Sequence, residues 1–115
     1  MAKIANISTE HLFTALAHPL RLQVLLLLQH TEGEELCVCD LSRALEVSQP
    51  MISRHLALLR QWGLVSNRRQ RLRIYYRLQD DLPAWVRKVL TATADGFAEE
   101  TLYEGDFSTL AAVFG

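Results

Sequence analysis

Apolar residues recur at intervals of three and four positions along most of the chain, which is the spacing of helices that bury one face. This pattern predicts five helices, over about residues 9–18, 19–29, 39–45, 48–62 and 83–103. Pro19 marks the first boundary, because a proline cannot continue a helix but suits the first turn of the next. Ser48 is a good N-cap, and Gly63 stands where glycine ends helices.

After Leu64 the period shortens to two, which predicts a β-hairpin. One face of it carries Leu72, Ile74, Tyr76 and Leu78, and the other carries Arg71, Arg73, Tyr75 and Arg77. A helix, a short helix, a tight turn, a capped helix and a hairpin are the order of a helix-turn-helix followed by a wing. The expected fold class is mostly α with a β-hairpin wing, a winged helix-turn-helix in the order α-α-α-α-β-β-α.

Length and composition fit one compact core, since the chain has 115 residues and 50% of them are hydrophobic. We expect a single winged helix-turn-helix domain over residues 1–105 and a C-terminal tail over 106–115. The longest purely apolar stretch, Val24 to Leu28, is far shorter than the roughly 20 residues of a membrane-spanning helix. With no secretory signal at the N-terminus, a cytoplasmic location without a membrane partner is expected.

Charge is unevenly distributed, although the net charge is only −1. Residues 47–79 hold seven arginines and no acidic residue, whereas residues 1–46 hold three basic and six acidic side chains and residues 80–115 hold two and seven. A basic block between acidic flanks indicates one face that meets a polyanion. A solvated arginine-rich loop is the alternative explanation.

The helix predicted at 48–62 suits DNA reading, because small polar residues occupy its first exposed turns. Its candidate DNA-binding residues are Ser48, Gln49, Ser53, Arg54 and His55, and the hairpin adds Arg68, Arg69, Arg71 and Arg73. Gln49 could read adenine, and Arg54 could read guanine or bind a phosphate. Capping alone for Ser48 and packing alone for His55 are the alternatives.

Three stretches, Glu35–Leu41, Ser48–Arg60 and Tyr75–Leu78, closely resemble the ArsR/SmtB family of metal-responsive repressors. The likeness covers about residues 9–100. It implies a homodimer that binds double-stranded operator DNA with an inverted repeat and releases it on binding metal. It also implies a dimer surface on the first and last helices, with Leu12, Leu16, Trp85, Val89 and Phe97 as contacts.

The resemblance assigns Cys37 and Cys39 as the metal ligands, and thiolates favour soft acceptors such as As(III) and Sb(III). No constitutive cofactor is implied. Arsenical sensors of the family often carry a third cysteine where this chain has Ser42. The third bond of As(III) would then need hydroxide, a small thiol or another side chain, or the inducer would be a methylated trivalent arsenical with two open valences.

The two cysteines also carry expectations of their own. A reducing compartment would keep them as thiols, and a disulfide between them would close a small, strained loop. In a regular helix, residues i and i+2 point about 200° apart, so both sulfurs could hold one ion only if the helix start were reshaped. Two inert, buried cysteines are the simplest alternative.

The sequence also allows or disfavours several other functions. The same fold could sense thiol oxidation, reactive sulfur or another soft metal, or could bind DNA constitutively. A thiol–disulfide enzyme is disfavoured because the thioredoxin-like βαβ pattern is missing, and no enzyme activity is expected. The loose spacing of His11, His18 and His30 favours structural roles over a zinc site.

Overall fold

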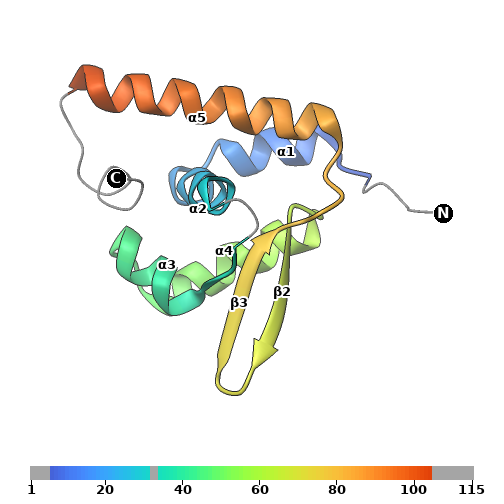
Figure 1. Cartoon of the computed structure of the whole chain (residues 1–115), viewed down its shortest axis with the longest axis vertical. Helices are drawn as coiled ribbons and strands as arrows, with labels where there is room; N and C mark the ends of the chain where they lie inside the picture. Colours follow the sequence, from blue (N-terminus) through green and yellow to red (C-terminus); the bar gives the residue numbers. More distant parts are fainter. Residues whose placement is uncertain (1–5, 32–33, 105–115) are drawn as a thin grey trace.

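The computed structural model describes residues 6–31 and 34–104, with side chains as far as Glu100. The order of elements is α1 (Thr9–Leu16), α2 (Pro19–His30), β1 (Leu36–Cys37), α3 (Val38–Leu45), α4 (Gln49–Gln61), β2 (Val65–Gln70), β3 (Arg73–Leu78) and α5 (Ala84–Glu104). In Figure 1, α5 runs across one end of the molecule beside α1, α3 and α4 lie on the other side of α2, and the β2–β3 hairpin projects away. The predicted tail over 106–115 lies outside the described residues.

The winged helix-turn-helix predicted from the sequence is confirmed, with one added strand. Strand β1 pairs antiparallel with β3, Leu36 opposite Tyr76 and Cys37 opposite Tyr75, which gives a sheet of order β1-β3-β2. Two residues are too few to show an alternating pattern, so periodicity could not reveal this strand. Its consequence is functional, because β1 ties the cysteine segment directly to the wing.

Helix α2 forms the centre of the core, as its apolar run predicts. Val24 to Leu28 are all buried, and the core cluster continues through residues from every other helix and from the sheet. Pro19 occupies the first turn of α2, next to the 102° bend that separates it from α1. Among the described residues, no single helix is long and apolar enough to cross a membrane; α1 and α2 pass that test only as a bent pair, by length and composition.

The turn at the tip of the wing consists of Arg71 and Leu72, between the paired residues Gln70 and Arg73. Arg71 has a φ of +58°. A positive φ at the first turn position is typical of a type II′ turn, which favours glycine there. Leu72 is 97% exposed, so the prediction that it shares a buried face with Tyr76 is wrong: the turn carries it out of the strand.

Candidate functional site

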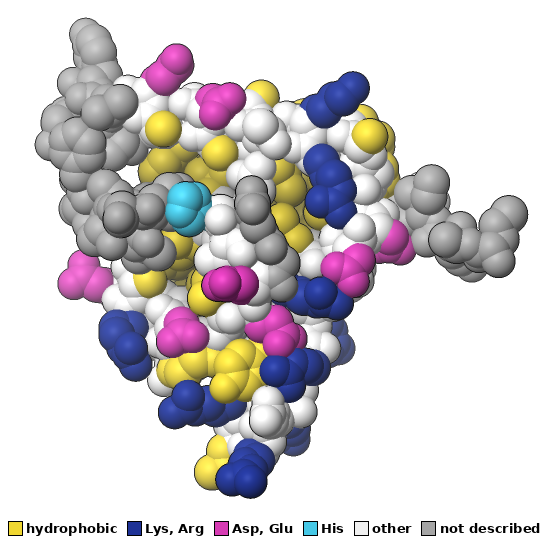
Figure 2. All heavy atoms as spheres, viewed as in Figure 1, with side chains coloured by type: hydrophobic (Ala, Val, Ile, Leu, Met, Phe, Trp, Pro, Cys, Tyr) yellow, Lys and Arg dark blue, Asp and Glu magenta, His cyan; other side chains and the backbone are white. Residues whose placement is uncertain are grey.

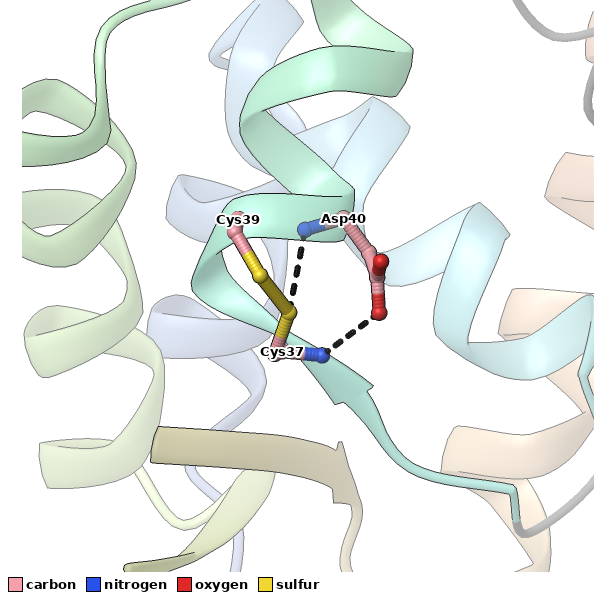
Figure 3. Close-up of a disulfide and its surroundings, with 3 residues drawn as sticks. All are labelled: Cys37, Cys39 and Asp40. Atoms are coloured by element: carbon pink, nitrogen blue, oxygen red, sulfur yellow. Dashed lines mark hydrogen bonds between the residues drawn. A yellow bond between two sulfur atoms is a disulfide. The ribbon is translucent and has the colours of Figure 1, made fainter. Parts of the chain in front are cut away.

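Cys37 is the N-cap of α3 and lies outside the helix, with extended backbone angles of φ −78° and ψ 161°. Its Sγ accepts the backbone N–H of Asp40 at 3.2 Å, and the Asp40 carboxylate accepts the backbone N–H of Cys37 at 3.1 Å (Figure 3). This reciprocal arrangement is a capping box, which satisfies two otherwise unpaired donors at the helix start. The sequence analysis missed the role of Asp40, although a capping residue followed three positions later by an acid was a readable signal.

The sulfurs of Cys37 and Cys39 are joined in a disulfide, whereas the sequence analysis expects two thiols. The prediction that the two sulfurs could approach one ion only if the helix start were reshaped is also wrong. That prediction assumed that both cysteines lie in one regular helix, but α3 begins at Val38 and leaves Cys37 in extended backbone. The two Cα atoms are 5.2 Å apart, within the usual range for bridged cysteines. Both sulfurs therefore reach a common point without unwinding of the helix.

Asp40 completes a group of three potential ligands with the cysteine pair. One ligand atom from each of Cys37, Cys39 and Asp40 lies within 4.8 Å of the others, and within residues 6–31 and 34–104 no other group of three or more His, Cys, Asp or Glu meets this criterion. Cys37 is buried and the other two are half-buried. After reduction of the disulfide, two thiolates and one carboxylate oxygen would suit a soft cation better than a hard one.

A pocket of about 160 Å³ opens beside the cysteine pair. Its lining comes from three elements: Cys37, Val38 and Cys39 at the start of α3, Gln49 and Ser53 on α4, and Leu72, Arg73 and Ile74 on the wing. The candidate metalloid ligands and three of the candidate DNA-binding residues therefore share one pocket.

The first turns of α4 present a polar surface. Ser48 caps the helix by accepting the backbone N–H of Met51 at 3.4 Å, and Ser48, Gln49, Ser53 and Arg54 are exposed. These positions are compatible with the predicted contacts to DNA, which remain predictions.

His55 requires a correction, because it lies inside the protein with 9% of its surface exposed. Its Nδ1 is 3.3 Å from Nη1 of Arg21, and its ring centroid is 4.4 Å from that of His18. Burial lowers the pKa of His55 below its usual 6.5, with further contributions from the charges of His18, Arg21 and Arg54. A buried, neutral imidazole does not fit a direct DNA contact, so we remove His55 from that set and assign it to the packing of α4 against α2.

Arg21 is a residue that sequence reasoning missed. It donates to the backbone oxygens of Thr14 and Ala15, at 2.9 and 3.4 Å, and its guanidinium lies 5.5 Å from the ring centroid of Trp62. His11 stacks on the same Trp62, and His18 caps α2 through its Nδ1. Arg21 and these two histidines thus join α1, α2 and the end of α4.

The wing carries four exposed arginines, Arg68, Arg69, Arg71 and Arg73. Figure 2 shows Lys and Arg side chains gathered on the projecting part of the molecule. Arg68 differs, because its Nε donates to both carboxylate oxygens of Glu35 at 2.7 and 2.8 Å and its guanidinium lies over Tyr75. Arg68 is therefore held by the protein itself, next to β1.

The predicted dimer contacts divide into two groups. Leu12 is fully buried within the protomer, so assigning it to a surface was wrong. Leu16, Trp85, Val89 and Phe97 are half-buried and pack against the core. Phe13, which the sequence analysis did not select, is 56% exposed on α1. Consecutive residues of a helix point in different directions, so Leu12 faces the core while Phe13 reaches the surface.

Comparison with known proteins connects these features to a family. Residues 18–67 match the family described as "Bacterial regulatory protein, arsR family". The "Arsenical resistance operon repressor" of Escherichia coli (strain K12) is 53% identical over 79 residues, which cover 69% of this chain and 66% of that protein. The "Arsenic resistance transcriptional regulator ArsR1" of Pseudomonas putida is 47% identical over 87 residues, which cover 76% of this chain and 66% of the relative. The chain thus spans slightly less than two thirds of these relatives' length.

Solved structures agree with the fold. HlyU from Vibrio cholerae superposes with a TM-score of 0.66 and 34% identity, over 77% of this chain and 90% of that one. A "homodimeric winged helix-turn-helix DNA-binding domain" from Mycobacterium bovis, described as a possible ArsR-family regulator, superposes with a TM-score of 0.59 and 31% identity, over 83% and 82% of the two chains.

Proposed function

This chain belongs to the arsR family of bacterial regulatory proteins, and from that membership we propose that it is a transcriptional repressor that binds operator DNA as a homodimer and releases it when trivalent arsenic or antimony binds Cys37 and Cys39. The observation that carries the proposal is the shared pocket, which the cysteine pair lines together with Gln49 and Ser53 of α4.

DNA binding is supported by the exposed polar start of α4 and by the exposed arginines of the wing. In a winged helix-turn-helix, the second helix of the motif enters the major groove and the wing lies against the backbone or minor groove. The homodimeric neighbour supports two-fold assembly, and Phe13 of α1 and Trp85 of α5 offer apolar surface for it. A dimer would place two α4 helices on the two halves of an inverted repeat.

Release is proposed to begin at the capping box. In the dithiol form, Cys37 and Cys39 bind the metalloid as thiolates, and Cys37 Sγ then shares its electrons with the ligand and no longer accepts the N–H of Asp40 at full strength. The start of α3 loosens as a result. Because α3 packs directly against α4, the change reaches the DNA-reading helix and couples the two sites.

Inorganic arsenite needs a third ligand besides the two thiolates. Hydroxide or a small thiol can supply it, and so can Asp40, whose ligand atom lies within 4.8 Å of the two sulfurs. The hydroxyl of Ser42 donates to the backbone oxygen of Val47, just beyond the opposite end of α3 from the cysteine pair.

Operator binding, followed by fluorescence anisotropy, tests this function. The reduced protein is titrated with arsenite, methylarsenite, antimonite, cadmium and zinc, using the wild type, Cys37→Ser and Cys39→Ser. We expect trivalent arsenicals and antimonite to release the wild type and neither variant. Cys37→Ser is the cleaner variant, because serine preserves the N-cap. Zinc-driven release that persists in both variants would contradict the proposal.

The disulfide favours a second candidate, a repressor of the same fold that senses thiol oxidation. The two thiols would lose two protons and two electrons to a peroxide or polysulfide as the S–S bond forms. Operator affinity of the oxidised and reduced wild type separates the two functions. An oxidation sensor changes affinity between these forms without any metalloid, whereas a metalloid sensor responds to arsenicals only when reduced.

A further inference from the structure

The pocket beside the cysteine pair is larger than a bare arsenic ion needs. Its volume of about 160 Å³ is similar to that of engineered apolar cavities, about 150 Å³, that hold benzene. Cys37 and Cys39 line it, together with Leu72, Arg73 and Ile74 of the wing. A ligand held by both sulfurs would therefore have space for a further group of methyl to phenyl size.

Leu72 gives this space an apolar boundary that the fold itself does not use. Its side chain is 97% exposed, and Arg71 before it adopts a φ of +58° that costs a non-glycine residue free energy. A single exposed leucine is ordinary on a protein surface. This one borders a pocket with Ile74 and two sulfurs, so a ligand in the pocket would remove its apolar surface from water.

The chemistry of two thiols matches an arsenical that already carries one carbon substituent. In R–As(OH)₂, the two As–O bonds break and two As–S bonds form, the two thiol protons leave with the hydroxyl groups as two waters, and arsenic stays trivalent with its As–C bond intact. The disulfide must first be reduced, either by a dithiol, which supplies two electrons and two protons and becomes a disulfide, or by a phosphine, which supplies two electrons and becomes the phosphine oxide while water supplies the two protons. Carbon fills the third valence, so Asp40 can keep its bond to the N–H of Cys37.

We propose that the pocket receives the organic substituent of monosubstituted trivalent arsenicals, and this proposal rests on the proposed function. Leu72 and Ile74 would make the site prefer these arsenicals over inorganic arsenite. The substituent would contact Gln49 and Ser53 as well, since both line the pocket. Selectivity and release would then arise in the same place, between the sulfurs and the start of α4.

Direct binding to the reduced protein, without DNA, tests the pocket. Affinities for phenylarsenous acid, methylarsenous acid and arsenite are measured by calorimetry or by arsenic–thiolate absorbance, with a phosphine as reductant. The variants are Leu72→Ala, which removes the apolar boundary, and Ser53→Leu, which fills the pocket. Met51→Ala is the matched control, because Met51 is 39% exposed on α4 and does not line the pocket.

We expect the wild type to prefer phenylarsenous acid to arsenite. Leu72→Ala should reduce this preference about tenfold, because each methylene buried against the substituent is worth about a fourfold change in affinity. Ser53→Leu should remove the preference and leave arsenite affinity within about twofold, and thermal melts confirm that it folds. Met51→Ala should match the wild type.

The possible failures are distinguishable. Equal preference for phenylarsenous acid in the wild type, Leu72→Ala and Ser53→Leu would overturn the pocket and leave the proposed function standing. An absence of binding by all three arsenicals would overturn both. Tight binding with the expected selectivity in this experiment, combined with no operator release in the anisotropy titration, would support the pocket and contradict the proposed function.

Discussion

Cys37 and Asp40 cap the first turn of α3 for each other, with Sγ to N–H and carboxylate to N–H distances of 3.2 and 3.1 Å. The sulfur proposed to bind the inducer is therefore also a structural acceptor. Any ligand or substitution at Cys37 acts on the stability of α3 as well as on sensing. In the proposed function, this dual role would let a small ligand at the edge of the helix-turn-helix act on α4 through α3.

Removing the cap should destabilise the protein without any ligand. Asp40→Ala and Cys37→Ala are each expected to lower the free energy of unfolding by about 1 kcal/mol, because each leaves a helix N-terminal donor without its partner. Chemical denaturation of the reduced protein measures the change. Asp40→Asn and Cys37→Ser keep an acceptor and should lose less than half as much. Equal stability of Asp40→Ala and the wild type would show that the carboxylate contributes nothing to the helix start.

Stability should fall on acidification because of His55. Its pKa is lowered from 6.5 in the folded protein, mainly by burial, so the unfolded chain takes up the proton at a higher pH than the folded one. The contribution is present above about pH 6.5 and is lost as the pH falls from there toward the folded pKa. Thermal melts between about pH 7.5 and 5.5 should show a decreasing melting temperature.

The matched variant for this prediction is His55→Gln, which keeps an acceptor for Arg21 and does not titrate. It should flatten the pH dependence, whereas His30→Gln, at the exposed end of α2, should preserve it. An unchanged slope in His55→Gln would show that the pH response does not come from His55.

The salt dependence of operator binding should reflect the number of arginines that can contact DNA phosphates. Arg68 is held by Glu35, which leaves Arg54, Arg69, Arg71 and Arg73 exposed. If these four reach phosphates in each subunit, a dimer makes eight contacts and log K should fall with log salt at a slope of about −7. Arg69→Ala should bring the slope to about −5, because two contacts are lost per dimer. Lys88→Ala, exposed on α5, is the control, and a flat titration of the wild type would contradict the proposed interface.

Local signals predicted most of the fold. Pro19 and Gly63 mark helix ends through their backbone conformation and Ser48 through its side-chain hydroxyl, and Gly63 does have a φ of +81°. An added Cβ at Gly63 would lie 3.0 Å from Cδ1 of Ile7, so glycine serves the packing there as well as the turn. Such features depend on few residues and are visible without tertiary contacts.

The site was less predictable because it depends on pairing between distant segments. Cys37 lies in extended backbone because β1 pairs with β3, a contact across nearly forty residues that no local pattern encodes. The inward position of His55 was readable, since it lies three residues after Ile52 and four before Leu59 on the buried stripe of α4. The pocket could not be predicted because the wing tip forms part of its lining. The turn at that tip could not be assigned without the φ of Arg71.

Assembly provides the last prediction. Phe13 is 56% exposed on α1, on the helix where the family resemblance places the dimer surface. Phe13→Asp should weaken dimerisation roughly 100-fold or more, because two aromatic side chains lose their burial and two carboxylates take their place. Sedimentation equilibrium measures the change, and circular dichroism should show a folded protomer because Phe13 lies outside the core. Leu72→Ser, at a more exposed apolar position on the wing, is the control. A Phe13→Asp protein that remains dimeric would place the interface elsewhere.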